Sequence, residues 1–214
     1  MNTKTKKIAV IGMFCALAYV AMLVIKIPVV MFLDYEPKDV VITLCGMIYG
    51  PLSAAAVSVV TSLVEMVTVS DTGVIGLLMN VLSTLAFSCT AAAIYKHKRT
   101  MYGAVAGLVI GTVAMTVVML LWNYIVTPMY MGLPRDQVAA MLVPVFLPFN
   151  LLKGFINAAL TYLLYRPVVK ALGASKLLPE SESGPKKLNA PMLVVSLAVL
   201  VTGALVIMAY NGLI

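Results

Sequence analysis

The sequence has few charged residues for its length. Only 11% of its 214 residues are charged, whereas 62% are hydrophobic and the mean hydropathy is +1.05. A soluble domain of this size needs more polar residues to cover its surface. The long apolar runs also lack the two-residue alternation of polar and apolar positions that is typical of a membrane β-barrel. These shortages predict an all-α integral membrane protein.

Residues that commonly carry catalysis or bind metals are scarce as well. The single histidine, His97, lies in a KHKR loop, and the HExxH, GxSxG and GxxxxGK[ST] motifs are absent from the sequence. The cysteines Cys15, Cys45 and Cys89 lie in apolar segments without metal-ligand spacing. We therefore expect no enzyme, no cofactor and no metal site, and a chain that does not hydrolyse ATP itself.

Long apolar runs are what the sequence has in quantity. About 20 residues cross a bilayer core, so these runs predict transmembrane helices. Their approximate limits are 7–27, 39–49, 51–69, 73–95, 101–130, 141–170 and 190–210. The second is short, and Gly50-Pro51 after it predicts a tight turn into the third.

The polar stretch 171–189 divides the chain. It is rich in Ser, Gly, Pro and charge, which is typical of a flexible linker. We expect a six-helix membrane core over residues 1–170, a cytoplasmic linker over 171–189 and one additional transmembrane helix within 190–214.

Basic residues orient the predicted bundle, because Lys and Arg accumulate on cytoplasmic loops. A cytoplasmic N-terminus leaves only Lys26, Lys38 and Arg135 on the outer side, with Lys153 inside the membrane. Asp39 is expected among the acidic residues of the outer side, where the C-terminus would also lie. The net charge of +7 is explained by this topology and by anionic lipid head groups, so no nucleic-acid partner is expected.

Lys153 stands inside the apolar run PVFLPFNLLKGF, where an ionisable group is costly unless it has a partner. Asn150 precedes it by three residues and Asn157 follows it by four, so all three share one helix face. We predict that Asn150 and Lys153 line a ligand pocket opening outward. The alternative is hydrogen bonding between helices, which suits Asn157 in particular.

Two further helices carry polar candidates near their outer ends. Asn123 and Thr127 are four residues apart and share a face, and Pro128 is expected to bend the helix there. Tyr124 belongs either to the pocket or to an interfacial aromatic belt. Asn80 either completes the pocket or bridges helices.

Three other features complete the candidate site. The loop 26–39 is unusually apolar between Pro28 and Pro37, so we expect it to fold over the pocket as a lid that contributes Leu33 and Asp34. The alternative is that the first helix continues past Pro28. Glu65 is expected to have a helix-end or structural role, and Tyr130 to join the aromatic belt.

The first helix contains GMFCA, in which Gly12 and Ala16 have the spacing of small residues that permits close helix approach. This pattern alone is common in membrane helices. It becomes informative beside the segments LDYEPKDVV, GLLMNVLST, NYIVTPMYMG and PFNLLKG.

Together these segments resemble a substrate-binding S component of an energy-coupling factor (ECF) transporter, most nearly the riboflavin-specific type. The resemblance covers about residues 5–170. It implies six core helices in a prokaryotic cell membrane and riboflavin as transported ligand rather than cofactor. It also implies a membrane coupling protein and two ATPase subunits as partners.

The resemblance also assigns residues. Asn123, Asn150 and Lys153 match the positions that hydrogen-bond flavin in that family, and Gly12 and Ala16 match its small-residue contact with the coupling protein. Other interpretations are an S component for a different vitamin, a small channel or a structural membrane subunit. An intramembrane enzyme is disfavoured because no nucleophile and base are paired.

Overall fold

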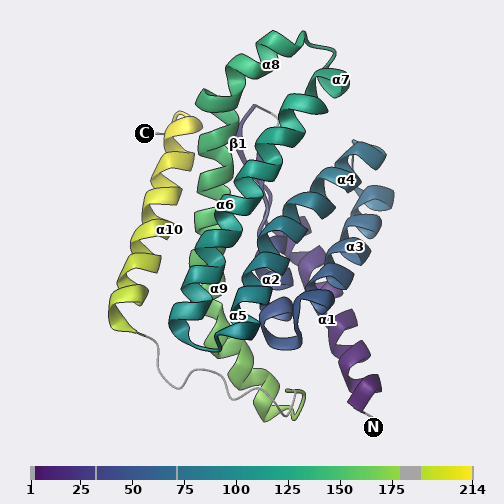
Figure 1. Cartoon of the computed structure of the whole chain (residues 1–214), viewed down its shortest axis with the longest axis vertical. Coiled ribbons are helices and arrows are strands. Elements are labelled where there is room, and N and C mark those ends of the chain that lie inside the picture. Colours follow the sequence, from purple (N-terminus) through teal and green to yellow (C-terminus); the bar gives the residue numbers. More distant parts are fainter. Residues whose placement is uncertain (1–2, 32, 71, 179–188, 214) are drawn as a thin grey trace.

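The structure is a computed structural model, which describes residues 3–31, 33–70, 72–178 and 189–213. Its helices pack side by side into one bundle (Figure 1). Six helical stretches are long and apolar enough to cross a membrane, among the residues described. In chain order the elements are α1 (Thr3–Val24), β1 (Ile27–Val30), β2 (Leu33–Tyr35), α2 (Lys38–Tyr49), α3 (Pro51–Thr68), α4 (Gly73–Thr84), the one-turn π-helix η1 (Leu85–Cys89), α5 (Thr90–His97), α6 (Met101–Ile125), α7 (Thr127–Met131), α8 (Arg135–Met141), the π-helix η2 (Leu142–Phe146), α9 (Leu147–Ala174) and α10 (Ala190–Tyr210).

The expected short second helix and tight turn are confirmed. α2 has 12 residues, and Gly50 after it adopts φ of 97°, which a residue with a side chain rarely adopts. Pro51 then starts α3, where its missing N–H costs no helical hydrogen bond. The remaining core helices are longer, and α4, η1 and α5 run on as one span.

Two expected helix limits were wrong. The segment expected over 101–130 breaks at Val126, because Pro128 cannot donate to the preceding turn and instead sits in the first turn of α7. The segment expected over 141–170 starts at Arg135 and ends at Ala174. Lys153 is therefore about five turns from the start of this span, deeper than a start at residue 141 would place it.

The loop between α1 and α2 forms a β-hairpin, so the alternative that the first helix continues past Pro28 was wrong. β1 and β2 are antiparallel, and Met31 at the turn has φ of 54°. Val29 and Tyr35 are buried against Phe149 and other apolar residues of α9. The hairpin thus lies over one end of the bundle.

Small residues set the closest helix contacts. Gly103, Gly107 and Gly111 recur every four residues along α6, where the backbone of Lys98, Ala91 or Phe87 leaves no room for a side chain. A Cβ at Gly154 of α9 would similarly lie 2.5 Å from Thr112 Cγ2. These close contacts fix the positions of α6 and α9, the two long helices that carry most of the predicted site.

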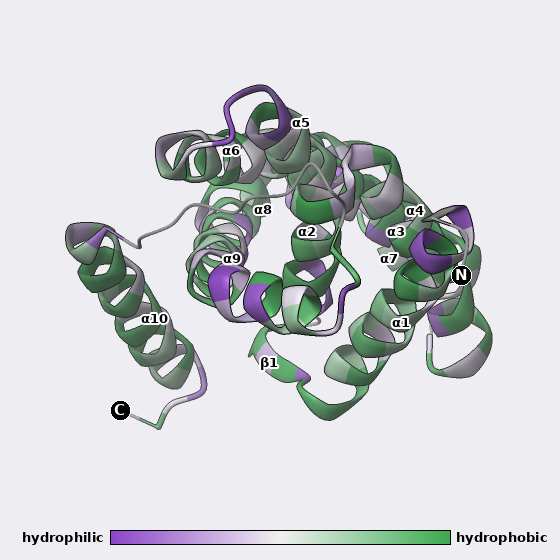
Figure 2. Cartoon of the chain, turned by 90° about the horizontal axis from the view of Figure 1, so that it is seen from below, coloured by the Kyte–Doolittle hydropathy of each residue, from purple (hydrophilic) through white to green (hydrophobic). Residues whose placement is uncertain are grey.

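α10 stands at the edge of the bundle, packed on α9, with its outer faces largely apolar (Figure 2). Its C-terminal end lies at the same end of the bundle as the hairpin, and the N-terminus of the chain lies at the other (Figure 1). The predicted six-helix core with one extra C-terminal helix is confirmed.

Candidate functional site

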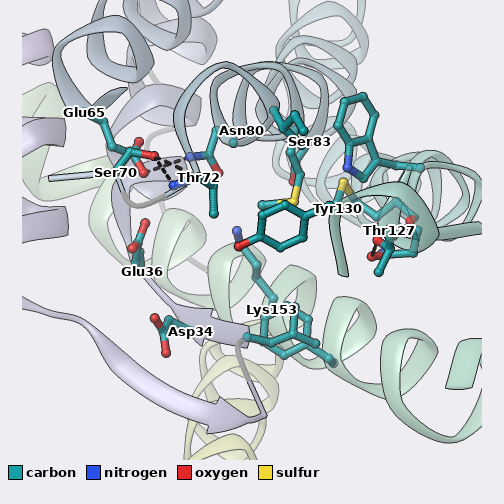
Figure 3. Close-up of a pocket in the computed structure, with 18 of the residues that line it drawn as sticks. Asp34, Glu36, Glu65, Ser70, Thr72, Asn80, Ser83, Thr127, Tyr130 and Lys153 are labelled. Atoms are coloured by element: carbon teal, nitrogen blue, oxygen red, sulfur yellow. Dashed lines mark hydrogen bonds between the residues drawn. The ribbon is translucent and has the colours of Figure 1, made fainter. Parts of the chain in front are cut away.

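A cavity of about 540 Å³ opens at the hairpin end of the bundle. Its walls come from α1, the hairpin, α3, α4, α6, α7 and α9, so helices distant in sequence meet there. Figure 3 shows Lys153, Thr127 and Tyr130 around the same space as the acidic residues Asp34, Glu36 and Glu65. The volume lies within the range of about 300–1,000 Å³ that is usual for small-molecule sites.

The structure brings most of the predicted site residues to this cavity. Tyr124 is the exception, since it lies off the cavity, 41% exposed, with the Arg135 guanidinium 5.6 Å from its ring centre. Tyr130, expected in the interfacial belt, lines the cavity instead. The predicted residues that line it are Leu33, Asp34, Asn80, Asn123, Thr127, Asn150 and Lys153.

The buried amides are fixed by their own helices. Asn123 Nδ2 donates to the Met119 carbonyl at 2.7 Å, while Asn123 Oδ1 accepts from the Thr127 hydroxyl at 2.8 Å. Asn150 Nδ2 donates to the Phe146 carbonyl at 2.7 Å. An amide NH₂ carries two hydrogens, so each side chain keeps a second donor after this bond. The cavity therefore presents amide groups that are already oriented.

Lys153 has a partner that was not predicted. Its Nζ lies 3.4 Å from Asp39 Oδ2, and the Asp39 side chain is fully buried. Asp39 also accepts from Thr84 Oγ1 at 2.6 Å and from Asn157 Nδ2 at 3.4 Å. Asp39 was expected at a helix start on the outer side, and it lies in the first turn of α2, but the burial of its side chain inside the bundle was not predicted.

Asn157 connects this cluster to the hairpin. Its Oδ1 accepts from the Tyr35 hydroxyl at 3.0 Å, and its Nδ2 donates to Asp39. Burial, and then the charge of Asp39, raise the pKa of the Tyr35 phenol, which therefore stays protonated as the donor. The polar chain Tyr35, Asn157, Asp39 and Lys153 thus runs from the hairpin to the cavity wall.

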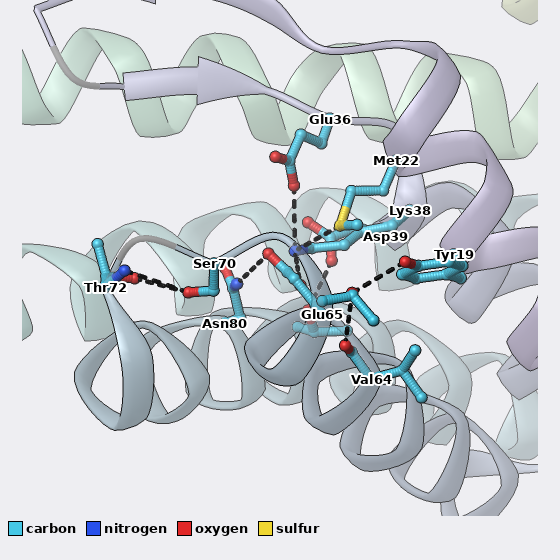
Figure 4. A network of polar contacts seen from close by, with 12 residues as sticks. Tyr19, Met22, Glu36, Lys38, Asp39, Val64, Glu65, Ser70, Thr72 and Asn80 are labelled. Carbon is cyan, nitrogen blue, oxygen red and sulfur yellow. Dashed lines mark hydrogen bonds and ion pairs between the residues drawn. The ribbon is translucent and has the colours of Figure 1, made fainter.

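A second buried network fixes the opposite wall. Lys38 Nζ lies 2.6 Å from Glu65 and 3.1 Å from Glu36, and Asn80 Nδ2 donates to Glu65 Oε1 at 2.8 Å (Figure 4). Lys38 is 1% exposed, and this burial was not predicted either. Glu65 holds helices together, as the structural interpretation expected.

The depth of Lys38 and Asp39 had a signal in the sequence. A helix of 12 residues is about 18 Å long, whereas the hydrocarbon core is about 30 Å thick. At least one end of α2 must therefore lie inside the membrane region. Charges at that end need partners, which Glu65 and Lys153 provide.

The lysines around the cavity each face a carboxylate. At the rim, Lys26 Nζ lies 3.2 Å from Asp34. Together with the two buried clusters, the ion pairs comprise three lysines and four acidic residues: Lys26, Lys38, Lys153, Asp34, Glu36, Asp39 and Glu65. The net formal charge of these groups is therefore −1. Apolar side chains such as Met119, Trp122 and Phe149 complete the wall. This combination suits a ligand with an apolar body, a polar edge and no net charge.

Residues 6–165 match the protein family described as "ECF transporter, substrate-specific component". The chain belongs to this family. It is therefore a multi-pass cell membrane protein of a transport family rather than of an enzyme family. Membership of this family implies association with an ECF module.

Two curated proteins are similar to most of this S component. The riboflavin transporter RibU of Staphylococcus aureus (strain TCH60) is 30% identical over 179 residues, 79% of this chain and 93% of the relative. The riboflavin transporter FmnP of Bacillus subtilis (strain 168) is 29% identical over 174 residues, 76% of this chain and 91% of the relative.

One solved structure of an S component is similar to this chain in fold. The chain described under "Structure and mechanism of the S component of a bacterial ECF transporter" superposes with a TM-score of 0.67 and 31% identity. The match covers 79% of this S component and 98% of the solved chain. α10 lies beyond the residues that match the family.

Gly12 and Ala16 lie away from the cavity, on an exposed face of α1. A Cβ added to Gly12 would meet nothing within 4 Å. Met13, Leu17 and Val20 beside them are also exposed apolar residues. This face of the S component is therefore open to lipid or to a partner helix.

Proposed function

We propose that this S component binds riboflavin at the outer face of the membrane and passes it to a separate energising module. The observation that carries the proposal is the cavity in which Asn123, Asn150 and Lys153 converge from two helices. The similarity to two relatives named as riboflavin transporters, each covered over nine tenths of its length, supports the choice of ligand.

The chemistry of riboflavin fits the cavity. Its isoalloxazine ring is flat and mostly apolar, with one edge of alternating carbonyl and N–H groups. Asn amides present donors and an acceptor to such an edge, and Lys153 donates to a carbonyl or a ribityl hydroxyl. Riboflavin carries no net charge, which suits a cavity in which each lysine already faces a carboxylate.

The hairpin is proposed as the lid of this site. Leu33 and Asp34 line the cavity, while Val29 and Tyr35 anchor the hairpin on α9. Ligand exchange then requires the hairpin to lift, which breaks the Tyr35 hydrogen bond to Asn157. The cytoplasmic N-terminus proposed from the basic residues places this end of the bundle outside.

The exposed face of α1 around Gly12 and Ala16 is proposed as the contact with the membrane coupling protein, which two ATPases drive. Small residues let a partner helix approach closely. The open space at Gly12 supports this role.

The test is the flavin content of the purified protein. We expect a yellow preparation with flavin absorbance, or an apoprotein that quenches riboflavin fluorescence on titration. A colourless protein that fails to quench riboflavin would overturn the choice of vitamin and point to an S component for another ligand. A channel would need polar residues along the whole depth of the bundle, whereas this cavity is lined by residues at the hairpin end.

A further inference from the structure

α10 makes a fitted contact with the core. Gly203 is buried against α9, where an added Cβ would lie 2.8 Å from Ile156 Cδ1 and 2.9 Å from Ile156 Cγ1. Leu152 lies beside the same spot. A glycine at this point lets the two helices approach closely, so α10 has a defined position on α9.

The end of α10 also touches the hairpin. Asn211 Nδ2 donates to the Pro28 carbonyl of β1 at 2.9 Å and to the Ile207 carbonyl at 2.9 Å. Leu200 and Ile207 of α10 join the apolar cluster that buries Val29. The hairpin therefore packs against two helices, α9 and α10.

Packing against α9 and α10 is important for the order of the hairpin, because the hairpin is small. Two antiparallel strands without further strands are marginally stable in water, so their order depends on what they pack against. Tyr35 supplies one anchor through Asn157 on α9. The contacts at Pro28 and Val29 give the hairpin a second anchor, part of which belongs to α10.

We propose that α10 is a positioning element of the binding site, which holds the hairpin closed through Asn211 and through its fit on α9 at Gly203. The contacts of α10 with the hairpin exist only while the hairpin is down, so they stabilise the closed state relative to the open one. Met31 and Leu33 of the hairpin line the cavity, so α10 slows ligand exit without touching the ligand. The proposal rests on the proposed function for the identity of that ligand and for the role of the hairpin as lid.

Two substitutions test the proposal, each with a matched control on the same helix. Asn211→Ala removes the hydrogen bond to Pro28, and Asn189→Ala changes the same residue type at the far end of α10. Gly203→Val pushes α10 off Ile156, whereas Ala204→Val adds bulk on an exposed face.

The first measurement needs no ligand. Hydrogen exchange of the full chain in nanodiscs is followed by mass spectrometry for the hairpin, residues 27–35, and for α4 and α6. We expect faster exchange in the hairpin alone for Asn211→Ala and Gly203→Val, with both controls like the wild type. Unchanged hairpin exchange, or faster exchange spread over α4 and α6, would overturn the proposal.

The second measurement is the dissociation rate of riboflavin by stopped-flow fluorescence. Losing one hydrogen bond changes an equilibrium by about twofold to tenfold, so we expect Asn211→Ala to release riboflavin faster by that factor. Gly203→Val displaces α10 as a whole and should also release riboflavin faster than its control. Equal dissociation rates in variants and controls would contradict the role of α10. A wild-type protein that binds no riboflavin would instead refute the proposed ligand, and hairpin exchange would still decide the role of α10.

Discussion

Lys153 shows how a charged residue is tolerated deep in an apolar helix. Its side chain is 13% exposed and faces the fully buried carboxylate of Asp39. Removing one member of a buried ion pair usually costs about 3–5 kcal/mol, because the other charge loses its partner. Asp39 keeps hydrogen bonds from Thr84 and Asn157, which places the expected cost at the low end of that range.

Lys153→Met is therefore expected to have two effects. Riboflavin affinity should fall by about 10- to 100-fold, because a charged hydrogen-bond donor is lost. The free energy of unfolding should also fall by about 3 kcal/mol, because Asp39 is left unpaired. Fluorescence titration measures the first effect and thermal unfolding in detergent the second.

The double variant Lys153→Met with Asp39→Asn separates these effects. Removing both charges should restore most of the stability and leave the affinity low. Lys170→Met makes the same change at an exposed position on the same helix and should alter neither quantity. A double variant that binds riboflavin like the wild type would show that Lys153 does not contact the ligand.

Helices of this bundle present small residues for two different purposes. Gly107 on α6 faces the core, where an added Cβ would lie 2.8 Å from the Ala91 carbonyl oxygen. Gly12 on α1 faces outward with open space around it. The sequence pattern of small residues four apart is the same at both sites, so only packing distinguishes a core contact from an exposed one.

Substituting valine at these two glycines should give opposite results. Gly107→Val should lower the free energy of unfolding by about 1–3 kcal/mol, because the α5 backbone cannot move aside freely. Gly12→Val should leave stability and riboflavin binding unchanged but reduce riboflavin uptake by cells that carry the complete transporter. Normal uptake by Gly12→Val would argue against the proposed contact with the coupling protein.

α2 is the element whose placement the hydropathy pattern predicted only in part. Its short length and the turn at Gly50-Pro51 were predicted correctly. Its charged first residues were assigned to the outer side of the membrane, and no buried partners were predicted for them. In the structure these residues lie inside the bundle, where Lys38 and Asp39 bind Glu65 and Lys153.

The two ends of the described chain lie at opposite ends of the whole molecule (Figure 1). When the short α2 is counted with the six described stretches that are long enough to cross a membrane, α10 is the seventh, and an odd number of passes puts the two ends on opposite sides. The end of α10 lies next to the hairpin, so in the proposed orientation, with a cytoplasmic N-terminus, α10 carries the chain to the outer side.

Tags on the two termini test this topology in intact cells. A tag after Ile214 should react with a membrane-impermeant reagent, whereas a tag before Met1 should react only after the membrane is permeabilised. The control is a protein with both tags in permeabilised cells, where both should react. A shielded C-terminal tag would contradict the proposed orientation.

The sequence by itself determined the membrane class, the approximate helical spans and the residues of two polar helix faces. Hydropathy and residue spacing are local properties, so spacing alone was enough to place Asn150 with Lys153 and Asn123 with Thr127. Family motifs then predicted that these two faces meet, and the cavity brings them together.

Tertiary structure alone decided which charges pair and what covers the cavity. Asp39 and Lys153 are 114 residues apart, and a salt bridge over that separation leaves no periodic signal in the sequence. The hairpin is short and depends on contacts with α9 and α10, so its shape could not follow from the apolar loop alone. The place of α10 was likewise fixed by the fit of the Gly203 backbone against the Ile156 side chain, a contact that hydropathy does not encode.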